Sequence, residues 1–200
     1  MNYKRLGFLA SHGGTNMQAI IDACNDGRIQ AIPAVVISNN GGSAALDRAT
    51  REGIPAYHIS SKKYHDQEAL DGAVHDVLLK HQVDLIVLAG YMKKIGMQTL
   101  ATFKGRIINI HPALLPRHGG KGMYGRKVHE QVLASGDTET GVTIHVVADE
   151  YDNGPILAQQ RVPVLENDTP DTLSERVLEI EHRLYVETID KIVRKELLLG

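Results

Sequence analysis

The chain has 200 residues, of which 23% are charged and 42% hydrophobic, and its formal net charge is −2. This length and composition predict a single folded domain, residues 1–200, with a sizeable core, and they exclude the disordered class. The scattered basic residues and an aromatic content of 4% do not fit nucleic-acid binding, so we expect small-molecule ligands.

Metal-binding and membrane-spanning patterns are also missing from the sequence. The single cysteine, Cys24, excludes an internal disulfide, and the histidines lack paired ligand spacing, so we expect no metal. No apolar run approaches the roughly 20 residues that a membrane span needs. Because no secretory signal pattern is present, we expect a cytoplasmic protein without a membrane partner. For the oligomeric state we expect either a monomer or a homodimer.

The first half of the chain alternates short apolar runs with helical patterns. Strands are predicted at residues 6–10, 32–37, 56–59, 84–89 and 107–110. Helices are predicted at residues 17–24, 44–52, 66–81 and 94–103. This alternation is typical of an α/β fold with a doubly wound, mostly parallel sheet and helices on both faces.

The second half departs from this alternation. Residues 117–125 contain four glycines and predict a mobile loop that could serve as a lid. A helix is predicted at residues 127–134. Two strands at residues 140–147 and 156–164 flank a turn, so we expect antiparallel strands at the sheet edge, followed by a long helix from Pro170.

A polar turn at residues 11–16 joins the first strand to the first helix. This arrangement presents backbone N–H groups and the positive end of a helix dipole to an anion. The turn lacks the third glycine of a dinucleotide fingerprint and the Lys-Ser/Thr pair of a Walker loop. It either binds a single phosphate through Gly14, Thr15 and Asn16, or is an ordinary turn in which Thr15 or Asn16 is the N-cap.

Asn109 and His111 are candidate catalytic residues at the end of the fifth strand. They alternate, so their side chains should share one side of it, and Pro112 ends the strand at the edge where open α/β sheets bind ligands. An amide can stabilise an oxyanion and an imidazole can transfer a proton, while a carboxylate such as Asp152 can orient either. His145 is either a support for this group or a structural histidine, and structural roles for Asn109 and His111 also remain open.

Three blocks, residues 109–116, 141–147 and 152–156, resemble the formyltransferase family that uses 10-formyltetrahydrofolate. The resemblance covers the whole chain and implies the family's Rossmann-like fold. It implies transfer of the formyl group to the amine of glycinamide ribonucleotide in purine biosynthesis. In this reaction Asn109 would polarise the formyl carbonyl, His111 would assist proton transfer, and Asp152 would hold the network and raise the pKa of His111.

The resemblance also implies binding residues. Those for the ribonucleotide are Gly14, Thr15, Asn16, Gly90 and Glu181. Those for the folate are Met92, Lys93, Ile95, Val147, Asp149 and Asp152. Three residues depart from the usual family pattern, namely His12 and Asn153, where glycine is common, and Lys93, where arginine is common.

Two other functions are compatible with the sequence. The chain could be another member of the family, including a formyltetrahydrofolate hydrolase, or a nucleotide-binding module without catalysis. The absence of a Ser or Cys nucleophile elbow favours direct attack by a substrate amine over a covalent enzyme intermediate. Single-turnover formyl transfer would distinguish these alternatives.

Overall fold

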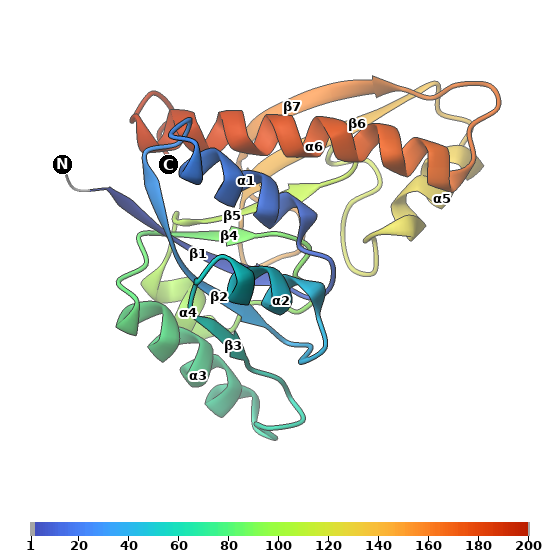
Figure 1. Cartoon of the computed structure of the whole chain (residues 1–200). Coiled ribbons are helices and arrows are strands. Elements are labelled where there is room, and N and C mark those ends of the chain that lie inside the picture. The colour runs from blue at the N-terminus through green and yellow to red at the C-terminus, as the bar shows by residue number, and fades with distance from the viewer. Residues whose placement is uncertain (1–2, 200) are drawn as a thin grey trace. The chain divides into compact units, whose positions relative to one another are not determined.

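The computed structural model describes residues 3–199. The chain divides into two compact units, Met1–Ile108 and Asn109–Gly200. Its strands form a seven-stranded sheet in the order β3-β2-β1-β4-β5-β6-β7 (Figure 1). The order is that of a sheet in which the chain starts near the middle, builds toward one edge and then returns to extend the other.

The first unit contains the parallel part of the sheet. Its strands are β1 (Lys4–Ala10), β2 (Ala31–Ser38), β3 (Ala56–His58) and β4 (Leu85–Leu88). Its helices are α1 (Thr15–Asn25), α2 (Ala44–Arg51), α3 (Gln67–Lys80) and α4 (Met97–Thr102). Strand β1 pairs in parallel with β2 and β4, and β2 pairs in parallel with β3. All four residues of β4 are buried, as expected for a central parallel strand covered on both faces.

Helix α4 is shorter than the predicted helix at residues 94–103. The carboxylate of Asp71 accepts hydrogen bonds from the backbone N–H of Gln98 at 2.7 Å and of Thr99 at 3.3 Å, and from the Thr99 hydroxyl at 2.5 Å. These bonds satisfy N–H groups in the first turn of the helix, so α4 begins at Met97. The later start of the helix thus depends on Asp71, which lies 28 positions before Thr99, and a contact at this distance cannot be predicted from the local sequence pattern.

The second unit contains the late strands and helices. Strand β5 (Ile107–His111) leads into it, followed by α5 (Arg126–Ala134), β6 (Glu139–Val146), β7 (Ile156–Pro163) and α6 (Pro170–Val193). Strands β6 and β7 are antiparallel, and α6 packs against both (Figure 1). Helix α6 begins with a capping box formed by Thr169 and Thr172, with Pro170 in its first turn. The predicted mostly parallel α/β sheet with antiparallel late strands is confirmed.

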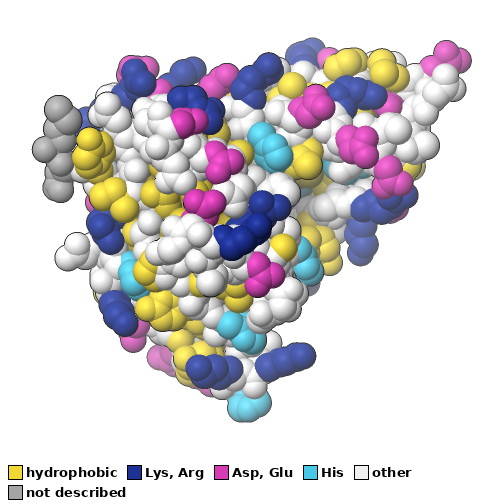
Figure 2. Space-filling model, viewed as in Figure 1, with side chains coloured by type: hydrophobic (Ala, Val, Ile, Leu, Met, Phe, Trp, Pro, Cys, Tyr) yellow, Lys and Arg dark blue, Asp and Glu magenta, His cyan; other side chains and the backbone are white. Residues whose placement is uncertain are grey.

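Charged side chains of both signs are interspersed on the face of the molecule shown in Figure 2. Within residues 3–199, no helix is long and apolar enough to cross a bilayer.

Candidate active site

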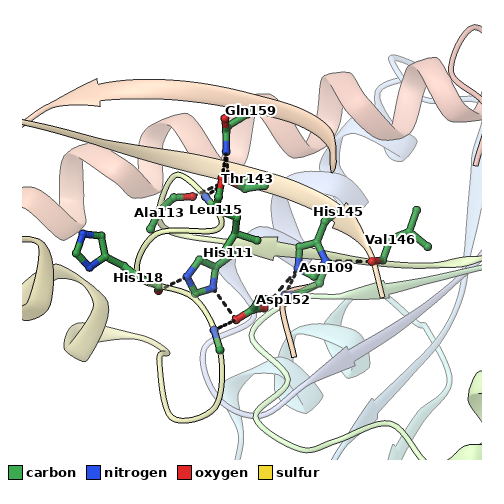
Figure 3. A network of polar contacts seen from close by, with 11 residues as sticks. Asn109, His111, Ala113, Leu115, His118, Thr143, His145, Val146, Asp152 and Gln159 are labelled. Carbon is green, nitrogen blue, oxygen red and sulfur yellow. Dashed lines mark hydrogen bonds and ion pairs between the residues drawn. The ribbon is translucent and has the colours of Figure 1, made fainter. Parts of the chain in front are cut away.

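Four polar side chains meet in the second unit (Figure 3). Strand β5 carries Asn109 and His111, β6 carries His145, and the turn after β6 carries Asp152. Asp152 Oδ2 lies 3.6 Å from His111 Nδ1, and Asp152 Oδ1 lies 3.5 Å from His145 Nε2. The structure therefore brings together the predicted Asn109, His111 and Asp152, with His145 as the fourth member of the cluster.

The contacts of His145 fix the orientation of the Asn109 amide. His145 Nδ1 lies 3.1 Å from the backbone carbonyl of Val146, so this nitrogen carries the proton. His145 Nε2 is then an acceptor in the neutral ring, and Asn109 Nδ2 donates to it at 3.1 Å. The Asn109 amide has a second N–H, which the bond to His145 leaves available for a ligand.

His111 is held in a defined tautomer by the main chain. Its Nε2 lies 2.8 Å from the carbonyl oxygen of His118 and donates a hydrogen bond to it. In the neutral ring Nδ1 therefore carries no proton. This is the atom that faces Asp152, so the proton-accepting nitrogen of His111 lies next to a carboxylate (Figure 3).

The pKa of His111 is lower than its usual value of 6.5. Burial, which disfavours the charged ring, is the largest cause and outweighs the raising effect of Asp152 and of the bond to the His118 carbonyl. The charges of His145 and His118 lower this pKa further. The expected raising effect of Asp152 is present, but burial of His111, which is only 3% exposed, outweighs it and sets the net direction.

Asp152 is ionised and held in an uncommon backbone conformation. Burial tends to raise the pKa of its carboxyl group, but the interactions with His145 and His111 and the hydrogen bond from the Gly120 amide together lower it below 3.8. The Gly120 N–H donates to Oδ2 at 2.9 Å. Asp152 has a φ of 54°, a left-handed conformation that aspartate adopts more readily than most residues do.

The start of the glycine-rich loop at residues 117–125 is anchored to this cluster. Asp137 accepts hydrogen bonds from Arg117 Nη2 at 2.5 Å and from His118 Nε2 at 2.6 Å. The His118 carbonyl and the Gly120 amide then contact His111 and Asp152. The sequence did not indicate Asp137, His118 or Gly120 as part of the site. His118 and Gly120 contact it through backbone atoms, which any residue carries.

A second group of hydrogen bonds fixes the segment after His111. The Thr143 hydroxyl donates to the carbonyl of Ala113 at 2.6 Å and accepts from the Leu115 N–H at 3.0 Å. Gln159 Nε2 donates to the same hydroxyl at 2.9 Å and to the Leu115 carbonyl at 3.1 Å. This group joins the chain after β5 to strands β6 and β7, and it thereby holds the end of β5 beside His145.

The turn before α1 lies in the first unit. Gly14 is the N-cap residue, with a left-handed φ of 66°, and no side chain caps the helix. The alternative that Thr15 or Asn16 is the N-cap is therefore wrong. Ser11 connects this turn with Gly90, because Ser11 N donates to the Gly90 carbonyl at 3.1 Å and Ser11 Oγ accepts from Met92 N at 2.8 Å. Gly90 is thus hydrogen-bonded to Ser11, the first residue of the turn that contains the predicted ribonucleotide residues Gly14, Thr15 and Asn16.

A cavity of about 440 Å³ in the first unit is lined by two of the predicted folate residues, Lys93 and Ile95. Tyr91 and Lys94 also line it, whereas Met92 is 38% exposed and is not among the lining residues. Burial raises the pKa of Tyr91 to about 12, so this phenol stays neutral and can donate a hydrogen bond. Charged residues of both signs, Lys93, Lys94 and Asp71, thus line the cavity together with apolar residues.

The remaining predicted binding residues lie in the second unit. Glu181 is a buried residue of α6, 8% exposed. Burial raises the pKa of Tyr185, and the charge of Glu181 raises it further. Val147 is half-buried and Asp149 is exposed in the segment between β6 and Asp152. Among the residues that the structure describes, no group of three or more His, Cys, Asp or Glu has an arrangement that could hold a metal ion.

Known proteins resemble this chain over nearly all of its length. Residues 4–189 match the family described as formyl transferase. A phosphoribosylglycinamide formyltransferase from Arabidopsis thaliana, named as chloroplastic, is 43% identical over 97% of this chain and 67% of its own length. The enzyme of that name from Haemophilus influenzae is 40% identical over 91% of this chain and 84% of its own.

Solved structures show the same relationship. The crystal structure of glycinamide ribonucleotide transformylase 1 from Symbiobacterium toebii is 41% identical and superposes with a TM-score of 0.91. That alignment covers 96% of this chain and 89% of the other. The chain therefore belongs to the formyl transferase family and, within it, to the phosphoribosylglycinamide formyltransferases.

Proposed function

We propose that this chain transfers the formyl group of 10-formyltetrahydrofolate to the amine of glycinamide ribonucleotide, a step of purine biosynthesis. The observation that supports this most is the orientation of Asn109 and His111. An N–H donor and an unprotonated imidazole nitrogen are fixed on one strand, two residues apart, by separate hydrogen bonds to His145 and to the His118 carbonyl.

In this proposal Asn109 stabilises the oxyanion. The substrate amine attacks the formyl carbon, and the carbonyl π electrons move to the formyl oxygen. The second N–H of the Asn109 amide donates to that oxygen as its charge develops, which is the interaction expected to lower the barrier most. Because the first N–H is bound to His145, the amide is already oriented before substrate arrives.

His111 transfers the proton. The attacking nitrogen becomes positively charged, and His111 Nδ1 accepts one of its protons. The C–N10 bond then breaks, its electron pair returns to N10, and N10 receives the proton as the carbonyl of the product forms. The lowered pKa of His111 keeps the ring neutral at pH 7, in the form that accepts a proton. Asp152 stabilises the imidazolium formed between these two transfers.

Binding of the two substrates is assigned to the remaining predicted residues. The ribonucleotide phosphate binds at Gly14, Thr15 and Asn16, with Gly90 beside this turn and Glu181 as a hydrogen-bond acceptor for the ribose hydroxyls. The folate uses Lys93 and Ile95, which line the cavity, together with Met92, Val147 and Asp149. The proposal uses no metal ion. A cytoplasmic location, and a monomer or homodimer without nucleic-acid or membrane partners, remain our predictions.

A single-turnover experiment tests the proposal. Enzyme in excess over 10-formyltetrahydrofolate is mixed with glycinamide ribonucleotide, and the formylated ribonucleotide is measured by mass spectrometry. We expect one product molecule per folate. Formate release without the ribonucleotide would indicate a hydrolase instead, and ribonucleotide binding without any product would indicate a non-catalytic module.

A further inference from the structure

Helix α2 holds the turn that precedes α1. The backbone carbonyl of His12 accepts a hydrogen bond from Ala45 N at 3.0 Å. The next carbonyl, that of Gly13, accepts one from Arg48 Nε at 2.9 Å. Both donors belong to α2, so two successive carbonyl groups of the turn are directed toward this helix.

This arrangement determines where the following N–H groups point. In a planar trans peptide, the carbonyl oxygen and the N–H of the next residue lie on opposite sides. The amides of Gly13 and Gly14 therefore face away from α2. Among residues 3–199, neither amide has a hydrogen-bond acceptor. Successive N–H groups of this kind form an anion-binding nest, to which the N-terminus of α1 adds its dipole.

Helix α2 is also fixed to α1 at its other end. Glu52, directly after α2, accepts hydrogen bonds from Gln18 Nε2 at 3.0 Å and from Asn25 Nδ2 at 3.1 Å, both on α1. At the turn itself, a Cβ atom on Gly14 would lie 2.9 Å from Ala45 Cβ, so only glycine fits there without a shift. The two helices and the turn are thus packed as one body.

We propose that Arg48 is a positioning residue for the phosphate of the ribonucleotide. It acts through the Gly13 carbonyl, whose bond to Arg48 Nε fixes the direction of the Gly14 amide, and it places a positive charge beside the anion-binding turn. This inference rests on the proposed function for the identity of the ligand. It adds a residue outside the turn, on a helix whose sequence pattern does not point to substrate binding.

Arg48→Ala tests the inference, with Arg51→Ala as a matched control. Arg51 belongs to the same helix and is exposed, and its side chain makes no hydrogen bond or ion pair among the described residues. We expect Arg48→Ala to raise KM for glycinamide ribonucleotide about tenfold, in keeping with a lost bond to a charged donor. We expect kcat and KM for the folate to stay within about twofold.

Arg48→Lys separates the hydrogen bond from the charge. A lysine keeps the charge but lacks the rigid donor fork. We therefore expect a KM for the ribonucleotide between those of wild type and Arg48→Ala, with the lysine reversing less than half of the increase caused by alanine. If Arg48→Ala does not fold, as circular dichroism would reveal, Arg48→Lys provides the same test. The inference would be overturned if KM for the ribonucleotide were unchanged in the Arg48 variants. It would also be overturned if Arg51→Ala raised this KM as much as Arg48→Ala does, or if Arg48→Ala weakened the binding of both substrates equally.

Failure of the proposed function would be recognised separately. If the wild-type chain does not formylate glycinamide ribonucleotide, titration calorimetry with ribose 5-phosphate still reports on the turn. In that case weaker binding of this phosphate monoester to Arg48→Ala, but not to Arg51→Ala, supports the role of Arg48. Equal binding to all three proteins contradicts it.

Discussion

His111 Nδ1 and Asp152 Oδ2 are 3.6 Å apart, which is too far for a direct hydrogen bond and close enough for a strong electrostatic interaction. The two groups are held apart by different partners, because His111 Nε2 is bound to the His118 carbonyl and Asp152 Oδ2 to the Gly120 amide. Nδ1 thus remains able to accept a proton from a ligand, while the carboxylate stabilises the resulting cation.

Removal of the imidazole should affect catalysis far more than binding. We expect His111→Ala to lower kcat by about 10²- to 10⁴-fold, the usual contribution of general acid-base catalysis. The dissociation constant of glycinamide ribonucleotide, measured by calorimetry, should change less than about threefold, because His111 is assigned to proton transfer. A variant that keeps more than about a tenth of the wild-type kcat would contradict the assigned role.

The pH dependence of Asp152→Asn tests the electrostatic part of the mechanism. His111 must be neutral to accept a proton, so activity should fall on the acid side as the pH passes through its pKa, below 6.5. Asp152 raises that pKa. Its replacement should therefore lower the pKa of His111, and the acid limb of the kcat/KM profile should move to lower pH.

The same variant should also turn over more slowly, because the imidazolium intermediate loses its counter-charge. We expect a fall in kcat of at least tenfold, with the circular dichroism spectrum unchanged. An acid limb that stays in place, or moves to higher pH, would show that Asp152 does not control the ionisation of His111.

A stability prediction concerns the segment that precedes α6. Asp168 has a side chain only 3% exposed, and its two carboxylate oxygens each lie 2.7 Å from a nitrogen of Arg176. The hydrogen bonds from Arg176, which are the largest cause, hold the pKa of Asp168 well below its usual range. We expect Asp168→Asn to lower the free energy of unfolding by about 2 kcal/mol near pH 7, as for a lost charge-assisted bond.

The sign of its pH dependence follows from linkage. A carboxyl group with a lowered folded-state pKa stabilises the fold fully above its unfolded-state pKa of about 3.9. This stabilisation is lost as the pH falls toward the folded-state value. Urea unfolding should therefore show a constant difference between wild type and variant above about pH 5, and a narrowing one below pH 4. If the difference in unfolding free energy between wild type and variant is the same above about pH 5 and below about pH 4, the ionised Asp168–Arg176 pair is not its source.

Much of the framework could be predicted from local sequence. The apolar runs of β1 and β4 are buried as their composition indicates, and alternation in β5 predicted that Asn109 and His111 would lie on one side. Asp152, 41 residues beyond His111, was a candidate partner because it lies in a turn after a strand, and the family resemblance made its role specific. Periodicity alone carries no information about contacts between distant segments.

Other features depend on tertiary structure and had no local signal. The lowered pKa of His111 results from burial by the folded chain, which overcomes the charge of its neighbour. The contacts of His118 and Gly120 with the site are made by backbone atoms, so their side chains gave no indication. Gly14 acts as the N-cap through its left-handed conformation, whereas N-cap preferences point to residues with side-chain acceptors.

His145 should act on catalysis through Asn109. The imidazole accepts one N–H of the Asn109 amide, and without this acceptor the amide can rotate and present its oxygen to the developing oxyanion. We expect His145→Ala to lower kcat by about 10²-fold, near the effect of losing one oxyanion donor. Asn109→Ala should lower kcat by at least as much, for the same reason.

A double-mutant cycle then separates an action through Asn109 from an independent one. If His145 only orients the amide, the double variant His145→Ala/Asn109→Ala should have the same kcat as Asn109→Ala alone, since no amide remains to be oriented. Multiplicative losses would instead mean that His145 contributes separately, and its 3.5 Å approach to Asp152 would be the first contact to test. Near-additivity of the two free-energy changes would therefore contradict the role assigned to His145.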